Sequence, residues 1–173
     1  MTRYLQTVRF NPYIPHEPTE KQALFLMHDH IKEILYGGAA GGGKSDALLM
    51  GALQYVHVPE YRALLFRRTY KDLALPKALM DRADEWLSGT DAKWDASERT
   101  WKFPSGASLT FGYLENDRDK YRYQSAEFQY IAFDELTQFT ESQYLYLFSR
   151  LRRLAGQDIP LRMRAASNPG GVS

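Results

Sequence analysis

The chain has 173 residues, of which 44% are hydrophobic and 25% are charged; 22 basic and 21 acidic residues give a net charge of +1. It contains no cysteine, which excludes disulfide scaffolds and cysteine-ligated metal centres, and the balanced charge excludes a polycation that binds nucleic acid over its whole surface. No apolar run reaches the roughly 18 residues that a membrane span requires, so we expect a soluble intracellular protein that forms one domain over residues 1–173.

The N-terminal region is predicted to be irregular before a short helix begins. Residues 1–18 read as an extended arm, because prolines recur in the stretch NPYIPHEP. Thr19 and Gln22 have the spacing of a capping box, which predicts a helix that ends near His28. The apolar stretch from Ile31 to Tyr36 runs directly into glycines and predicts a buried strand.

The glycines belong to a phosphate-binding pattern. GAAGGGKS, residues 38–45, matches G-x-x-x-x-G-K-[ST] in full. Glycines let backbone N–H groups converge on phosphate oxygens, and a helix that starts at the end of the loop adds the positive end of its dipole. Lys44 is expected to reach the β- and γ-phosphates, and Ser45 to hold Mg²⁺; the alternative is a glycine-rich turn formed by chance. The predicted phosphate-binding residues are Gly38, Ala39, Ala40, Gly41, Gly42, Gly43, Lys44 and Ser45.

Strand and helix patterns alternate through the middle of the chain. A second apolar strand is expected from Arg62 to Arg67, followed by a helix with Pro76 in its first turn and a stop at Gly89. Residues 100–103 and 107–113 flank a PSG turn and predict a hairpin. A charged loop is expected from Glu115 to Ser125.

Two acids follow the next predicted strand. FQYIAFDEL reads as a buried strand that ends in Asp134 and Glu135, and ligands of open α/β sheets bind at such strand ends. Asp134 is predicted to act on the Mg²⁺ held by Ser45, and Glu135 to be the general base for the water that attacks ATP. The alternative is an exposed pair of acids without a catalytic role.

The last elements complete the pattern. ESQYLYLFSRLRRL, residues 141–154, predicts a helix, and LRMRAAS, residues 161–167, predicts a strand that ends in the turn NPGG. The alternation of strands and helices predicts an α/β fold of the RecA-like P-loop class. We expect a mostly parallel central sheet, helices on both faces and a β-hairpin insertion.

Together these motifs resemble the ATPase domain of the large terminase subunit of tailed bacteriophages. The resemblance rests on GGAAGGGKS, RYQSAEF, YIAFDELTQF and ASNPGG, and with PTEKQ it covers nearly the whole chain. It implies an ATPase that uses Mg²⁺ and moves double-stranded DNA into the procapsid, in the host cytoplasm. It also implies a homo-oligomeric ring on the portal and the terminase small subunit as partners. Family members usually continue into a nuclease domain, which we expect to be absent here.

The resemblance assigns further site residues. Ser167 and Asn168 would form the coupling motif that senses the γ-phosphate, because a hydroxyl and an amide can hydrogen-bond a phosphate and then release it. The alternative is a plain turn, since S-N-P-G is strong turn chemistry. Gln22 would contact the adenine base, in competition with its role in the capping box.

The family's arginine finger has no direct counterpart. Where relatives carry Y-R-G, this chain reads Y-Q-S, with Gln124 in place of the arginine. The nearest substitute is Arg122, which is predicted to act in catalysis on a neighbouring subunit; a solvated loop charge is the alternative. Its rivals are Arg67, Arg68 and Arg118.

Other interpretations of the chain stay open. Five arginines between residues 149 and 164 would suit DNA phosphates, although a solvated helix face explains them as well. The whole chain would otherwise be an inactive nucleotide-binding module, a truncated prophage remnant, or a helicase-like ATPase. The motif residues at 44, 45, 134 and 135 are intact, which argues against the first. The five arginines are Arg150, Arg152, Arg153, Arg162 and Arg164.

Overall fold

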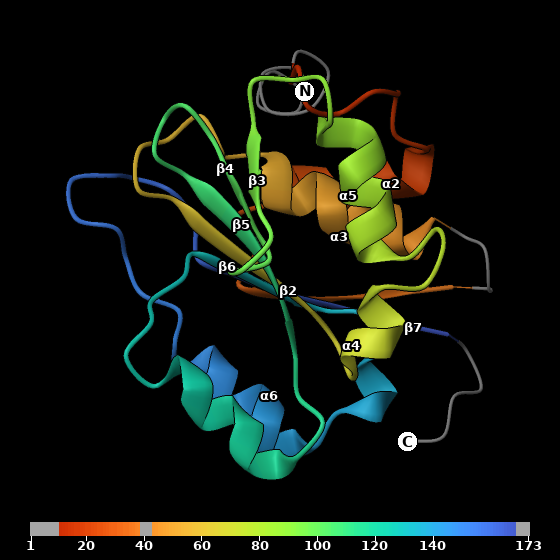
Figure 1. Ribbon diagram of the computed structural model, residues 1–173, viewed down its shortest axis with the longest axis vertical. Helices are drawn as coiled ribbons and strands as arrows, with labels where there is room; N and C mark the ends of the chain where they lie inside the picture. The colour runs from red at the N-terminus through yellow and green to blue at the C-terminus, as the bar shows by residue number, and fades with distance from the viewer. Residues whose placement is uncertain (1–10, 39–42, 169–173) are drawn as a thin grey trace.

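The computed structural model describes residues 11–38 and 43–168. Its centre is a seven-stranded sheet with the order β1-β7-β6-β2-β5-β4-β3 (Figure 1). The strands from β1 to β5 in this order pair in parallel, and β4 and β3 extend the sheet in antiparallel fashion. The strands are β1 (Glu33–Gly37), β2 (Arg62–Arg67), β3 (Lys93–Asp95), β4 (Thr100–Lys102), β5 (Ser108–Tyr113), β6 (Tyr130–Phe133) and β7 (Arg162–Ser167).

Helices cover both faces of this sheet (Figure 1). One face carries α2, α3 and α5, and the other carries α6. The predicted α/β fold, with a mostly parallel sheet between helices, is therefore confirmed. The helices are α2 (Glu20–Met27), α3 (Lys44–Leu53), α4 (Tyr70–Leu73), α5 (Leu79–Leu87), α6 (Glu141–Phe148) and the 3₁₀ helices η2 (Asp117–Tyr123) and η3 (Leu136–Gln138). None of the helices in the described ranges is long and apolar enough to cross a membrane.

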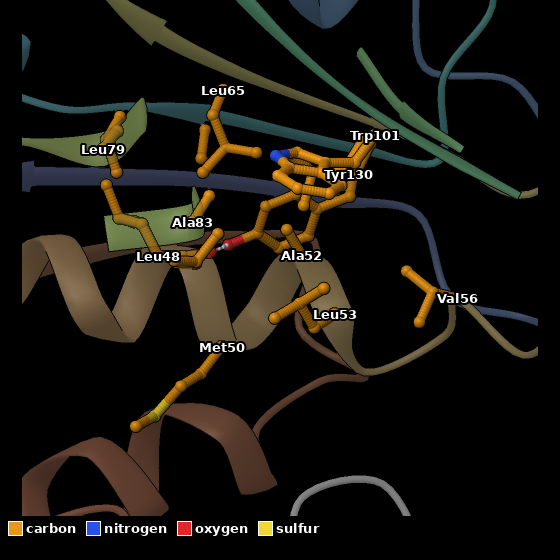
Figure 2. Packing of buried hydrophobic residues seen from close by; sticks show 14 of the residues in the cluster. Leu48, Met50, Ala52, Leu53, Val56, Leu65, Leu79, Ala83, Trp101 and Tyr130 are labelled. Carbon is orange, nitrogen blue, oxygen red and sulfur yellow. Dashed lines mark hydrogen bonds between the residues drawn. The ribbon is translucent and has the colours of Figure 1, made fainter. Parts of the chain in front are cut away.

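Helix α3 is deeply buried in the core. Leu48, Leu49 and Leu53 have no exposed surface, and burying each such side chain contributes about 1.5–3 kcal/mol. The hydroxyl of Tyr130 on β6 donates a 2.7 Å hydrogen bond to the backbone carbonyl of Leu48 (Figure 2). This contact fixes the helix against the sheet, and with it the residues at the helix N-terminus.

Three local predictions differ from the structure. Helix α6 ends at Phe148, six residues before the predicted end, because the backbone of Phe128 bonds to Arg150 and Arg152 at 3.0 Å and draws the chain into a short bridge. The predicted charged loop contains η2, which a capping box at Asn116 starts. Pro76 lies between α4 and α5 rather than in a first helical turn.

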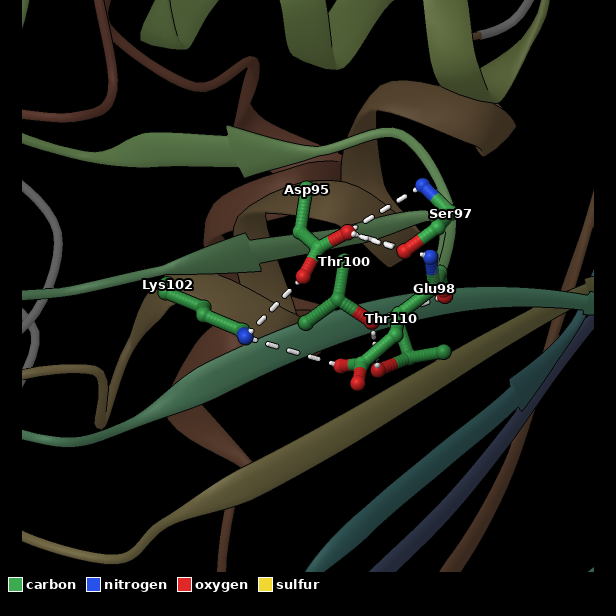
Figure 3. Close-up of polar contacts among 6 residues, drawn as sticks. All are labelled: Asp95, Ser97, Glu98, Thr100, Lys102 and Thr110. Carbon is green, nitrogen blue, oxygen red and sulfur yellow. Dashed lines mark hydrogen bonds and ion pairs between the residues drawn. The ribbon is translucent and has the colours of Figure 1, made fainter.

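The predicted hairpin is present and gains a strand. β4 and β5 form it, β5 pairs in parallel with β2, and β3 adds a further antiparallel strand. Asp95 closes the β3–β4 turn by accepting hydrogen bonds from Ser97 and Lys102, and these lower the pKa of its carboxyl to about 2 (Figure 3). Thr100 and Thr110 share a 2.8 Å hydrogen bond across the next strand pair. The hairpin is thus held by contacts at both of its strand pairs.

Two of the five arginines predicted to face DNA are buried. Arg162 and Arg164 on β7 are each 1% exposed. Arg162 donates to the carbonyl of Gly51 at 3.1 Å and to the side chain of Gln54 at 2.6 Å, and its guanidinium lies 4.6 Å from the centre of the Tyr130 ring. These contacts make Arg162 a core residue. The burial of both side chains overturns the two interpretations left open for this pair, contact with DNA phosphates and a solvated helix face.

Arg162→Ala is expected to lower the free energy of unfolding by about 3 kcal/mol or more. The substitution removes several buried hydrogen bonds, opens a cavity and leaves Gln54 without its cationic donor. Urea denaturation followed by circular dichroism measures the change. Arg153→Ala, at an exposed position of the same region, is the control and should change stability by less than about 0.5 kcal/mol. Equal, small effects would contradict a structural role for Arg162.

Strand β1 lies at an edge of the sheet. Within the described ranges it pairs only with β7, so its outer side has no strand partner. Leu35 on this strand is 59% exposed, and Ile31 just before it is 40% exposed. Leu24 on α2 adds a further exposed apolar side chain nearby, lining the same shallow hollow. We call these three residues the β1 rim.

Candidate active site

The parallel strands bring the predicted site residues to one edge of the sheet. Gly37 at the end of β1 is in register with Ser167 at the end of β7. Phe133, which precedes the acidic pair, is in register with Phe66, which precedes Arg67. Since all four strands run in the same direction, their C-terminal ends form a single rim where an open α/β sheet binds ligands.

One hydrogen bond at this edge joins the two main motifs. The hydroxyl of Ser45, in the first turn of α3, donates a 2.9 Å hydrogen bond to the carboxylate of Asp134, although 89 residues separate them. Asp134 is 2% exposed, and burial raises the pKa of its carboxyl, while the hydrogen bond from Ser45 and the charge of Arg67 act in the opposite direction. A hydroxyl and a carboxylate therefore meet at the end of the phosphate loop.

The described part of the phosphate loop shows how its ends are held. Lys44 is 8% exposed, and its ammonium donates to the carbonyl of Gly38 at 3.3 Å. Gly43 has a left-handed backbone with φ of 75°, which suits glycine. A side chain there would also come within 2.5 Å of Gln22. Four predicted phosphate-binding residues lie outside the described ranges: Ala39, Ala40, Gly41 and Gly42.

Gln22 connects helix α2 to this loop. Its side-chain oxygen accepts from the backbone N–H of Thr19 at 2.9 Å, which confirms the capping box. Its side-chain nitrogen donates to the carbonyl of Gly43 at 2.9 Å, and the residue is 2% exposed. Gln22 thus anchors the end of the loop through Gly43. Its contact with an adenine base stays a prediction.

Glu135 adopts an unusual backbone conformation. Its φ and ψ are both 58°, in the left-handed region, and it precedes η3 at the capping position. A non-glycine residue held there costs about 1 kcal/mol or more, and such strain concentrates at functional sites. The turn places the partly exposed Glu135 directly after the buried Asp134. The two adjacent acids therefore have different environments, one buried and one partly exposed, and their roles as metal ligand and general base stay predictions.

Ser167 and Asn168 lie beside the phosphate loop strand. Ser167 pairs in register with Gly37, and its hydroxyl makes a long 3.3 Å contact with the carbonyl of Asn168. Among the residues that the structure describes, the side-chain oxygen of Asn168 is buried and finds no hydrogen-bond partner. An unpaired buried amide oxygen is costly and calls for a missing donor. Both residues therefore lie at the same edge of the sheet as the phosphate loop strand, and their role as a coupling motif stays a prediction.

The two arginines of interest lie on different elements: Arg67 on strand β2 and Arg122 on the 3₁₀ helix η2. Arg67 ends β2, and its guanidinium lies 3.8 Å from the carboxylate of Asp134. Arg122 lies on η2, donates to the carbonyl of Tyr113 at 3.0 Å and pairs with Asp119 at 3.2 Å. Tyr113 ends β5, which lies beyond β2 in the sheet, so Arg122 is one strand further from Asp134 than Arg67 is. The side chain of Arg122 is 44% exposed.

The structure adds one cation that the sequence analysis missed. Lys21 on α2 donates to the carbonyl of Gly37, where β1 enters the phosphate loop. Its ammonium lies 4.8 Å from the centre of the Tyr36 ring. The only signal in the sequence was its place in PTEKQ, since spacing alone does not bring it to the loop.

The oxygen atoms of this edge fit a magnesium ion. Mg²⁺ is usually held by one or two protein oxygens together with water and substrate phosphates. Ser45 and Asp134 offer a hydroxyl and a buried carboxylate at 2.9 Å from one another. Burial raises the pKa of this carboxyl despite the nearby charge of Arg67, and a bound cation would oppose that shift.

Comparison with protein families gives one match. The family described as terminase large subunit, T4likevirus-type, N-terminal, matches residues 35–171. This range includes the phosphate loop, the acidic pair and the Ser167–Asn168 dipeptide. No curated protein matches the chain.

Solved structures agree with the family at the level of the fold. A large terminase from a thermophilic bacteriophage superimposes with a TM-score of 0.65 at 16% identity over 88% of this chain. A second crystal form of that terminase, in complex with ADP, gives a TM-score of 0.59 at 16% identity over 87% of this chain. The chain spans 40% and 38% of the length of these two structures.

Proposed function

The chain belongs to the terminase large subunit family, in the N-terminal part of its T4likevirus type, and from this premise we propose that it is an ATP-hydrolysing motor domain. In this proposal ATP is the substrate, Mg²⁺ is the cofactor, and hydrolysis drives double-stranded DNA into a procapsid. The ADP complex of the thermophilic phage terminase supports a nucleotide as the ligand of the matching fold.

One observation carries the proposal: the hydrogen bond between Ser45 and Asp134 at 2.9 Å. A phosphate loop or an acidic strand end alone is common, but a P-loop ATPase needs both at one point. The contact supports this meeting of motifs within a single chain. It also supports a shared role for the two side chains in holding the metal.

Each side chain at this edge has a chemical task in the proposal. Lys44 binds phosphate oxygens, and Glu135 accepts the proton of the attacking water. Ser45 and Asp134 hold Mg²⁺, which when bound neutralises charge on the β- and γ-phosphates. Asn168, with its unpaired buried oxygen, orients the water or senses the γ-phosphate together with Ser167.

Phosphate release from ATP tests the proposal directly. The chain should release phosphate only when Mg²⁺ is present, and Asp134→Ala should stop this release because it removes a metal ligand. Calorimetry with ADP, with and without Mg²⁺, measures binding separately. Nucleotide binding without any turnover would instead favour the inactive nucleotide-binding module. Absence of binding would contradict both functions.

The arginine finger is proposed to be Arg122, acting on a neighbouring subunit. Its side chain is exposed, and it contacts β5, which is two strands away from β6 in the sheet. Both features suit a contact across a subunit boundary. Arg67 is the alternative, because it already lies 3.8 Å from Asp134 in the same chain. The trans assignment predicts that activity per subunit rises with protein concentration, and the cis assignment predicts no such dependence.

If Arg122 acts in trans, activity per subunit should rise about tenfold as concentration brings subunits together. Mixing Glu135→Gln subunits, which keep Arg122, with Arg122→Ala subunits should restore turnover that the Arg122→Ala protein lacks alone. A steady-state phosphate assay over a dilution series measures both effects. Full activity in dilute protein, lost only in Arg67→Ala, would place the finger in cis and contradict the trans assignment.

We also propose that the chain has DNA and protein partners. Three arginines of the predicted DNA patch remain at or near the surface, and they offer sequence-independent phosphate contacts. A ring on the portal and the terminase small subunit follow from the family's role in packaging. The three remaining arginines are Arg150, Arg152 and Arg153.

A further inference from the structure

A cavity of about 250 Å³ lies between helix α5 and the β3–β4 hairpin. It shares no residue with the candidate active site. Two tryptophans of the hairpin and two aspartates of the helix are among the residues that line it. The lining residues are Ala74, Met80, Asp81, Asp84, Trp94 and Trp101.

The two tryptophans are fixed by the hairpin. Trp94 on β3 and Trp101 on β4 are directly opposite each other, with ring centroids 5.3 Å apart. Trp101 is 4% exposed and anchored in the core, whereas Trp94 is 37% exposed. The polar contacts of Asp95 and Lys102 at the neighbouring strand positions hold the two strands in register (Figure 3). The cavity is therefore lined by one buried indole, of Trp101, and one partly exposed indole, of Trp94.

The carboxylates are also held in place. Asp81 and Asp84 are three residues apart on α5, which puts them on one helix face. One oxygen of Asp81 accepts the backbone N–H of Lys77 at 2.8 Å, and one oxygen of Asp84 accepts the hydroxyl of Ser88 at 2.8 Å. In the described part of the chain, the second oxygen of each has no partner and neither acid forms an ion pair.

We propose that this cavity binds the guanidinium of an arginine presented by a partner protein. Indole faces attract cations, and a planar guanidinium can stack on an indole while it donates hydrogen bonds to carboxylates at its edge. A lysine ammonium is more compact and more strongly hydrated, so it gains less from stacking on an indole ring. The volume suits one side chain and falls below the roughly 300–1,000 Å³ of small-molecule pockets.

Indole N–H signals in ¹H–¹⁵N NMR spectra of the labelled chain test the proposal. The chain has three tryptophans, and the third, Trp86, faces the ring of His16 rather than the cavity. N-acetyl-arginine amide should shift the signals of Trp94 and Trp101 with a Kd on the order of millimolar, and leave Trp86 unchanged. N-acetyl-lysine amide carries the same charge and should bind roughly threefold or more weakly.

Matched variants separate the cavity from general electrostatics. Asp81→Asn with Asp84→Asn should raise the Kd of the arginine probe by about tenfold or more, because both charges are lost. Glu85→Gln changes the same helix at an exposed position outside the cavity, and should leave the Kd within about twofold. Thermal melts establish that all variants are folded.

Three results would overturn the proposal. The first is no shift of Trp94 or Trp101 by the arginine probe, and the second is equal binding of the lysine probe. The third is a shift of these signals upon concentrating the chain without any probe, lost in the double asparagine variant. That result would identify a second copy of this chain as the occupant, in place of a different protein.

Discussion

Lys44→Ala should reduce ATP hydrolysis at least about 10³-fold while nucleotide binding weakens far less. The ammonium of Lys44 is the positive side chain at the end of the phosphate loop, and it is held near Gly38 by a 3.3 Å contact. Its removal takes away charge stabilisation where negative charge develops, and groups of this kind contribute strongly to turnover. The backbone N–H groups and the helix N-terminus remain to bind phosphates. Phosphate release and calorimetry with ADP measure the two effects.

Lys93→Ala is the matched control for this prediction. Lys93 is an exposed lysine on β3, at the far side of the sheet from β1. Its loss should change neither binding nor turnover by more than about twofold. If Lys44→Ala hydrolyses ATP like the parent chain, the assignment of the phosphate loop is wrong.

Glu135→Gln should lower turnover by about 10²–10⁴-fold and preserve binding of Mg·ATP. The amide is nearly the same size as the carboxylate but cannot accept the proton of the attacking water. Ser45 and Asp134 stay in place, so the metal site should survive. Single-turnover phosphate release and calorimetry with a non-hydrolysable ATP analogue provide the measurements.

Glu127→Gln supplies the control for Glu135→Gln. Glu127 is an exposed acid before β6, at the opposite end of the strand, and its replacement should have no effect on turnover. Joint loss of binding and turnover in Glu135→Gln would mean that Glu135 holds the metal. Unchanged turnover would move the general base to another residue.

The parts of the fold that could be predicted are those with local causes. The capping box at Thr19 acts within one helical turn, and α3 follows from the loop that precedes it. The end of α6 could not be predicted, because Phe128, from a distant segment, competes for the backbone of Arg150. Strand β3 was missed because three residues give no measurable alternation, and it forms through the pairing of Trp94 with Trp101.

The candidate site divides in the same way. Lys44 and Ser45 can be predicted because they have fixed places in the phosphate-loop motif. Asp134 can be predicted because it is an acid at the end of a buried strand. The contact of Gln22 with Gly43 depends on how α2 packs, which no local pattern encodes. Arg162 was assigned to the surface because charge normally indicates exposure. Only the folded chain surrounds it with tyrosine rings and carbonyl groups.

The β1 rim has a practical consequence for solution work on this chain. An edge strand with apolar side chains and free backbone groups is a template for sheet-to-sheet aggregation, which natural proteins commonly prevent with a charged residue. Here Leu35 is an apolar residue of the edge strand that is 59% exposed. Light scattering should therefore show nonspecific clustering in concentrated samples, which Leu35→Lys relieves. The dilution series for the arginine finger is best run in that background, where a rise in activity reports ordered subunit contacts alone.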